Sequence, residues 1–151
     1  HYKKIVVFCY HKSAIHELRV RLARFNPTFI DGSVKHPVTR KQRETQFQED
    51  PNCHIMIGQI DTMGVAITLT AASEVAVIGP KYTPTDNTQA VLRVHRIGQK
   101  RPVRVRFFYI DNGSDKKLQK TLMRRTQDQA EMFDPFILGS MGRIQHPLEG
   151  L

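Results

Sequence analysis

The sequence predicts an α/β fold in which a mainly parallel β-sheet carries helices on both faces. Five short apolar runs recur along the 151 residues, and most of them are separated by stretches with helical periodicity. Short continuous apolar runs are typical of strands buried on both faces, and strands that alternate with helices indicate βαβ units. The length suits one domain with a substantial core.

The amino-terminal part predicts two strands joined by a helix. The first strand is predicted at Ile5 to Phe8, and the helix has Ser13 as its N-cap and apolar residues at helical spacing from Ile15 to Phe25. The second strand, Thr28 to Ile30, ends in Asp31-Gly32-Ser33, a tripeptide typical of turns.

The middle of the chain predicts a second helix and a third strand. Thr39 and Gln42 have the spacing of a capping box, which predicts a helix that ends near Asp50. The strand His54 to Gly58 follows, and the residues from Gln59 to Gly64 are predicted to form a loop.

Two more strands with a helix between them are predicted next. The fourth strand runs from Glu74 to Ile78, and Thr85 or Asp86 can cap the helix that follows a break at Pro80 to Pro84. The fifth strand is predicted at Val103 to Ile110, where apolar residues alternate with arginines. One face of this strand is therefore basic, which places it near the sheet edge with one side in water.

The end of the chain predicts a last helix and an irregular tail. The helix runs from Ser114 or Asp115 to Gln129. Residues 133–151 lack periodicity and contain several glycines and prolines, so we expect them to be irregular or partly disordered. Residues 1–132 then form one domain.

The composition indicates an anionic partner and a reduced environment. The chain has 23 Lys and Arg against 14 Asp and Glu, a net charge of +9, and such a chain most often binds nucleic acid. Cys9 and Cys53 form no C-x-x-C pair, so we expect an intracellular protein. No apolar run could span a bilayer, and the histidines form no H-E-x-x-H or paired Cys/His set, so neither a membrane partner nor a metal site is expected.

The stretch from Gln89 to Gln99 is predicted to be one helix that Gly98 stops. In a helix Gln89, Arg93 and Arg96 are spaced i, i+4, i+7 and share one narrow face. Two guanidiniums at a fixed separation suit a polyanion, because each fork can bind two phosphate oxygens. From spacing alone, an ordinary amphipathic helix with a solvated basic face is the alternative.

Three loops are expected at one edge of the sheet. In open parallel sheets, ligands bind beyond the carboxyl ends of the strands. The loops after the second, third and fourth strands should meet there: Asp31 to Ser33, Gln59 to Gly64, and Gly79 to Thr85.

The string from Gln89 to Gln99, Q-A-V-L-R-V-H-R-I-G-Q, resembles motif VI of superfamily 2 helicases in the form found in Swi/Snf-type DNA translocases. Three further blocks resemble motifs of that family in the same order: Lys4 to Phe8 (motif IV), Phe29 to Ser33 with Arg40 and Phe47, and Asp61 to Ala72 (motif V). The resemblance covers residues 4 to about 128. Three departures occur: Thr68 in place of Asn, Tyr82-Thr-Pro84 in place of Trp-Asn-Pro, and Leu92 in place of an acidic residue or glycine.

The resemblance implies the second RecA-like lobe of an ATP-driven translocase that moves on duplex DNA, with residues 1–132 as the helicase C-terminal domain. ATP with Mg²⁺ would be held mainly by a first, N-terminal RecA-like lobe of the same parent chain, because this sequence contains no G-x-x-x-x-G-K-[ST]. The isolated lobe is then expected to be an inactive monomer. Its location would be cytoplasmic in a bacterium or phage and nuclear in a eukaryote.

The same resemblance assigns roles around the nucleotide. Arg96 matches the arginine finger, and Arg93 matches a second contact with the γ-phosphate. Gln89 would position these groups or the attacking water. Asp61 and Gly64 of motif V would couple the nucleotide, near its ribose, to DNA.

DNA contacts are expected from loop amides, hydroxyls and basic side chains that face the phosphate backbone. For Ser33 and Thr62 the alternative is turn capping, and for Arg40 it is a solvated helix face. The candidates are Asp31, Gly32, Ser33, Arg40, Gln59 and Thr62.

Two other functions remain open from the sequence. One is a lobe of a strand-separating superfamily 2 helicase. The other is a basic nucleic-acid-binding module without a catalytic part.

Overall fold

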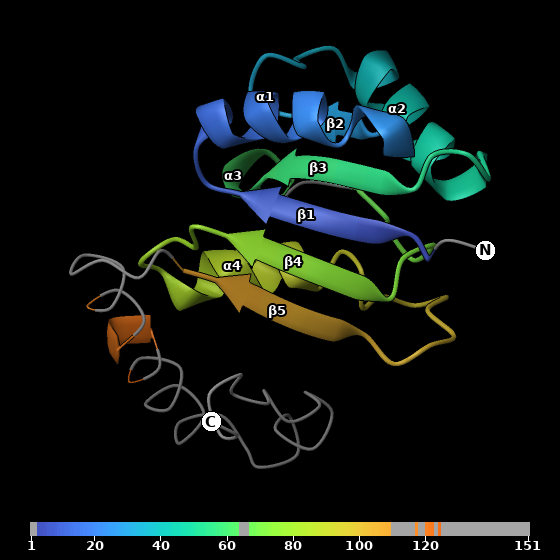
Figure 1. Cartoon of the computed structure of the whole chain (residues 1–151). Helices are drawn as coiled ribbons and strands as arrows, with labels where there is room; N and C mark the ends of the chain where they lie inside the picture. Colours follow the sequence, from blue (N-terminus) through green and yellow to red (C-terminus); the bar gives the residue numbers. More distant parts are fainter. Residues whose placement is uncertain (1–2, 64–66, 110–116, 118–119, 123, 125–151) are drawn as a thin grey trace.

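Five parallel strands form one sheet in the computed structural model, which describes residues 3–63, 67–109, 117, 120–122 and 124. The spatial order is β2-β3-β1-β4-β5, with every neighbouring pair parallel (Figure 1). The fold class predicted from the alternation of apolar runs and helical stretches is therefore confirmed. The strands are β1 (Ile5–Cys9), β2 (Thr28–Ile30), β3 (Ile55–Gln59), β4 (Glu74–Ile78) and β5 (Arg104–Phe108).

Helices cover both faces of the sheet. On one face α1 (Lys12–Arg21), followed by the short 3₁₀ turn Ala23–Phe25, packs against the sheet with its buried side chains. The other face is covered by α2 (Pro37–Glu49), α3 (Ile60–Met63) and α4 (Pro84–Val91) (Figure 1).

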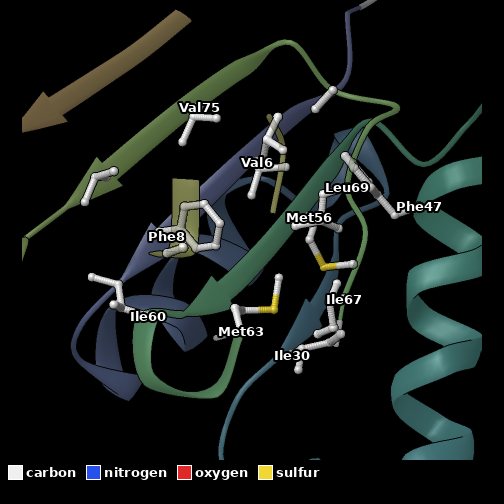
Figure 2. Packing of buried hydrophobic residues seen from close by; sticks show 14 of the residues in the cluster. Val6, Phe8, Ile30, Phe47, Met56, Ile60, Met63, Ile67, Leu69 and Val75 are labelled. Atoms are coloured by element: carbon white, nitrogen blue, oxygen red, sulfur yellow. The ribbon is translucent and has the colours of Figure 1, made fainter. Parts of the chain in front are cut away.

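The central strand β1 supplies both halves of the core. Because side chains alternate along a strand, Val6 and Phe8 join the cluster beneath α2, α3 and α4, whereas Val7 and Cys9 join the cluster beneath α1. Figure 2 shows the first of these clusters. Gly58 on β3 lets Met63 lie against the strand, because a Cβ at that position would overlap the Met63 side chain.

The fifth strand lies at an edge of the sheet, as its alternating pattern predicted. Arg104 and Arg106 are exposed, while Val105 and Phe107 pack against the core. Both arginines form ion pairs with Glu74 on β4, at 3.6 and 3.4 Å. The basic face of β5 is thus partly balanced by one carboxylate.

The predicted helix starts were wrong in three places. Ser13, Thr39 and Asp86 lie inside the first turns of α1, α2 and α4, and Thr85 does too. The N-cap positions carry no side-chain cap hydrogen bond. Two of these helices begin with a proline, Pro37 and Pro84, whose fixed φ suits the first helical position.

The predicted loop after β3 contains a short helix. The strand extends to Gln59, and Ile60–Met63 forms α3, because burying Ile60 and Met63 in the core favours a helical turn. Of the predicted last helix, Lys117, Lys120–Leu122 and Arg124 are described and helical. Its other residues, the domain boundary at residue 132 and the tail 133–151 lie outside the described residues.

Candidate functional site

The carboxyl ends of the strands meet at one edge of the sheet through Gln59, the last residue of β3. Its Oε1 accepts hydrogen bonds from the Gly32 amide (3.2 Å) and the Thr62 hydroxyl (3.3 Å). Its Nε2 donates to the carbonyl of Tyr10, just after β1, at 3.4 Å. One side chain therefore connects the turns after β1, β2 and β3, so two of the three predicted loops meet here. The third loop, after β4, joins them through the ion pair of Lys81 with Asp61.

The turn after β2 is organised by the buried carboxylate of Asp31, which is 1% exposed. Its Oδ1 accepts hydrogen bonds from the amide of Ser33 (2.9 Å) and from the Ser33 hydroxyl. Burial raises the pKa of Asp31, but these bonds and the charges of Lys12 and His16 outweigh burial and hold the pKa below its usual value. The turn thus keeps an ionised carboxylate beneath its backbone. The turn-capping role considered for Ser33 is present in the structure.

Thr62 and Arg40 also have internal partners. The Thr62 hydroxyl donates to Gln59, and the Thr62 carbonyl accepts a hydrogen bond from Nη2 of the half-buried Arg40. Arg40 therefore ties α2 to α3, and its face of α2 is not simply solvated. The hydroxyls of Ser33 and Thr62 already donate to Asp31 and Gln59. A phosphate at this edge would have to displace those hydrogen bonds or bind to cationic side chains such as Arg40.

Lys81, in the loop after β4, bridges two carboxylates. Its Nζ lies 2.5 Å from Oδ1 of Asp61 on α3 and 2.6 Å from Oδ2 of Asp86 on α4. The hydrogen bonds to Asp61 and then Asp86 raise the pKa of Lys81. Asn87 fixes the lysine backbone, since its Oδ1 accepts from the Lys81 amide (3.0 Å) and its Nδ2 donates to the Lys81 carbonyl (2.9 Å). The candidate Asp61 is thus held at a defined position relative to the start of α4.

The predicted helix from Gln89 to Gln99 is shorter than expected, because α4 ends at Val91. Turns follow, in which amides bond to carbonyls three residues back, as from Val94 to Val91 (2.9 Å). Gln89, Arg93 and Arg96 therefore do not share one helical face. Within this turn segment Val94 is fully buried, and Gly98, the predicted helix stop, lies beyond the end of α4 with a φ of +99°.

Gln99 fixes this turn segment to the loop before β4. Its Nε2 lies within hydrogen-bonding distance of the carbonyls of Thr70 (3.2 Å), Ala72 (2.6 Å) and Val94 (3.2 Å). Its Oε1 accepts from the amide of Arg101 at 3.0 Å. The Gln99 side chain thus ties the turn segment, at Val94, to the loop that ends at Ala72.

The arginines differ in their surroundings. Arg96 is exposed, and its Nη1 donates to the hydroxyl of Thr68 at 3.2 Å. Arg93 is half-buried, and its carbonyl accepts from the Leu69 amide at 2.9 Å. Gln89 is exposed on α4. Motif V and motif VI, as the sequence resemblance defined them, therefore contact each other directly.

Helix α2 in turn holds the segment that receives these contacts. The buried Glu44 accepts a hydrogen bond from the Thr68 amide at 3.1 Å. Gln48 accepts from the Ala71 amide (2.7 Å) and donates to the Thr70 hydroxyl (3.1 Å). The position of the Arg96 side chain is thus determined through α2 as well as through its own turn.

Sequence reasoning missed two residues that organise this region. Lys81 lies in the predicted break Pro80 to Pro84, where no spacing signals a partner. Gln99 was part of the motif VI string but had no assigned role. Gly64, a predicted nucleotide contact, lies outside the described residues.

Two features are absent from the described part of the chain: a metal-binding cluster and a membrane-spanning helix. That part contains no cluster of His, Cys, Asp and Glu able to hold a metal ion. None of its helices has the length and apolar character needed to cross a membrane.

Three comparisons identify similar proteins. Residues 1–98 match the family model "Helicase conserved C-terminal domain". The DNA repair protein RAD5A of Arabidopsis thaliana is 31% identical over 127 residues, which is 81% of this chain and 12% of the relative. The ATP-dependent helicase rhp16 of Schizosaccharomyces pombe is 35% identical over 109 residues, 72% of this chain and 12% of the relative. The human DNA excision repair protein ERCC-6-like is 39% identical over 79 residues, 52% of this chain and 6% of the relative.

A solved structure has the same fold. The crystal structure of the C-terminal part of the Fun30 ATPase domain superposes with a TM-score of 0.74 at 23% identity, over 80% of this chain and 39% of that one. This likeness confirms the predicted RecA-like lobe. The chain spans only 6 to 12% of the length of the three curated relatives named above. The family model covers most of the chain, and the chain belongs to the helicase conserved C-terminal domain family, in agreement with the predicted resemblance to the second RecA-like lobe of Swi/Snf-type proteins.

Proposed function

We propose that this chain is the second motor lobe of a DNA-dependent ATPase that translocates on duplex DNA and is inactive without its first lobe. The observation that carries the proposal is the exposed Arg96, whose turn is fixed by the buried Val94 and by the hydrogen bonds of Gln99. A guanidinium prepositioned at the surface can meet charge that develops on a phosphate held by another lobe.

The residues present fit a nucleotide that is shared between two lobes. The described contact of the Arg96 side chain is one hydroxyl, so other N–H groups stay available to the γ-phosphate of ATP. ATP would supply the transferable phosphoryl group, and its Mg²⁺ would be held mainly by the first lobe. Arg93 is proposed as the second phosphate contact and Gln89 as the group that orients Arg96 or water. Asp61 is proposed to lie near the ribose together with Gly64.

DNA is proposed to bind along the loops at the carboxyl edge of the sheet. Because Ser33 and Thr62 already donate inside the loops, a phosphate would draw mainly on the positive charges and on any donor that it displaces. Gln59 holds the Gly32 turn at this edge, and the Thr62 carbonyl holds Arg40. Asp31 orders the Gly32 turn through its hydrogen bond from the Ser33 amide. Such contacts follow the backbone and carry no base sequence.

The experiment replaces Arg96 by alanine in the parent protein that contains both lobes. DNA-stimulated ATP hydrolysis should fall by roughly 10³ to 10⁵, the usual value of an arginine finger, while DNA affinity stays nearly unchanged. Arg21→Ala is the matched control, because Arg21 is exposed on α1 and, among the described residues, its ion pair is with Glu17 at 2.5 Å. Hydrolysis that persists in the Arg96 variant would refute the finger assignment.

Two alternatives are distinguished by further measurements. The similarity to a protein named ATP-dependent helicase favours a strand-separating enzyme as the second candidate, and a strand-displacement assay separates it from a translocase. A non-catalytic nucleic-acid-binding module predicts that DNA affinity is indifferent to ATP in the parent protein. In a eukaryotic source, the proposed function implies a nuclear location.

A further inference from the structure

The β2 edge of the sheet brings cations from both helical layers to one aromatic ring. The guanidinium carbons of Arg19 on α1 and Arg43 on α2 lie 3.6 and 4.0 Å from the centroid of the Phe29 ring. The side chain of Lys12, at the start of α1, lies beside the turn that follows β2. A Cβ atom added to Gly32 in that turn would be 3.3 Å from the Lys12 Nζ. Figure 1 shows β2 between α1 and α2 at this edge. Three cationic side chains therefore line one margin of the lobe.

The positive charges at this edge exceed the negative charge available to them. Asp31 is the carboxylate whose charge acts on both Lys12 and Arg43. None of the ion pairs among the described residues involves Lys12, Arg19 or Arg43. Burial and then the neighbouring charge of Arg19 lower the pKa of Arg43. Because these cations lie close together and share one carboxylate, that of Asp31, their excess positive charge favours the approach of an external anion.

Stacking on the ring leaves the donor edges of both guanidiniums available. A guanidinium stacks through its face and presents five N–H donors in its plane. Arg43 uses Nη1 for the carbonyl of Phe29 at 2.7 Å, and within the described residues Arg19 donates no side-chain hydrogen bond. The ring thus fixes the orientation of two forks that can bind phosphate oxygens.

The two solvent-facing sides of α1 differ in charge balance. Lys12, His16 and Arg19 are spaced i, i+4, i+7 and share one face. On the opposite side Arg21 pairs with Glu17 at 2.5 Å, and both side chains are largely exposed. Only the face toward β2 is therefore a cationic surface without its own counter-ions in the described chain.

We propose that Lys12, Arg19 and Arg43 bind the phosphate backbone of the DNA, as an extension of the candidate DNA surface along the β2 edge. The inference rests on the proposed function, because β2 leads directly into the Asp31-Gly32-Ser33 turn of that surface. The contacts would lengthen the DNA footprint and strengthen binding at low salt without reading bases.

The test measures the salt dependence of duplex DNA binding by the parent protein. Each lost phosphate contact reduces the slope of log K against log salt by about 0.9, so Arg19→Gln with Arg43→Gln should lower it by about 2. Arg21→Gln removes the same charge from the other side of α1 and should leave the slope unchanged. DNA-stimulated ATP hydrolysis of the unsubstituted protein is measured in parallel.

Each outcome decides between the two proposals. The edge site is overturned if the double variant keeps the parental slope, or if Arg21→Gln lowers the slope equally. In that case DNA-stimulated hydrolysis in the unsubstituted protein still supports the motor function. If the unsubstituted protein neither binds DNA nor responds to it, the motor function fails and the edge site with it. Should circular dichroism show that the double variant is misfolded, Arg19→Gln alone decides, with an expected decrease of about 0.9 and an unchanged slope as the overturning result.

Discussion

Replacing Gln99 by alanine should loosen the turn that presents Arg96. The Gln99 amide has two N–H groups, so its three carbonyl contacts amount to about two full hydrogen bonds, and Oε1 accepts a third from Arg101. At about 1 kcal/mol for each bond, the loss is about 3 kcal/mol. A domain of this size loses about 2 to 4 °C per kcal/mol, so we expect the melting temperature to fall by about 6 to 12 °C.

Thermal unfolding of the chain measures the first effect, and ATP hydrolysis by the parent protein measures the second. The hydrolysis rate should fall more than DNA affinity does, because the released carbonyl of Val94 lies two residues from Arg96. Gln46→Ala on the exposed side of α2 is the control, and it should change stability by less than about 0.5 kcal/mol. Equal melting temperatures for the Gln99 and Gln46 variants would refute the view that Gln99 holds the turn.

Two more substitutions test the loops at the sheet edge. Lys81→Met removes both ion pairs and should destabilise the chain by about 1 kcal/mol, since Asp61 and Asp86 are partly exposed. Denaturant titrations should show this loss of stability at about 0.01 M salt and little of it at about 1 M salt. The control Lys81→Arg should have a stability close to that of the parent. A loss that salt does not change would contradict the ion-pair argument. Asp31→Asn tests the lowered pKa of the Asp31 carboxyl. A carboxyl whose pKa is lower in the folded than in the unfolded state stabilises the fold above about pH 4. This stabilisation disappears as the pH falls through the folded-state pKa. The stability difference between parent and variant should therefore be constant from pH 7 to 5 and shrink toward pH 2, and a pH-independent difference would contradict it.

The five strands could be predicted from their apolar runs, which are nearly continuous where both faces of a strand are buried. Ile5–Cys9 and Ile55–Gln59 carry nearly continuous apolar residues, since helices cover the sheet on each side. The edge position of Arg104–Phe108 was also readable, because a strand with one wet face must alternate. The fold therefore followed from local patterns that any half-buried or buried strand imposes.

The helix boundaries and the shape of the motif VI segment were not readable in the same way. Periodicity favoured one helix through Arg96, but the carbonyls of Thr70 and Ala72 that receive Gln99 belong to the tertiary structure. A prediction from spacing has no access to those partners. Pro37 and Pro84 mark the starts of α2 and α4, whereas the predicted hydroxyl and carboxylate caps lie one or two residues after them.

The candidate site was only partly predictable for the same reason. The meeting of the loops followed from parallel topology alone. The bridge from Lys81 to Asp61 joins residues twenty positions apart, and a lysine in a proline-bounded break resembles any solvated charge. The roles proposed for Arg96, Arg93 and Gln89 depend on a partner lobe, so they stay predictions.

One helix joins the two ends of this site mechanically. Arg40, Glu44 and Gln48 recur every four residues on α2, so they lie on one side of a rod and span about 12 Å. The first reaches α3 at the sheet edge, and the other two grip the backbone from Thr68 to Ala71 that supports Arg96. A helix of about three turns is stiff, so a displacement at one end is transmitted to the other end. If the loops bind DNA and Arg96 binds the phosphate as proposed, α2 would carry a movement of the Thr62 turn to the segment that contacts Arg96.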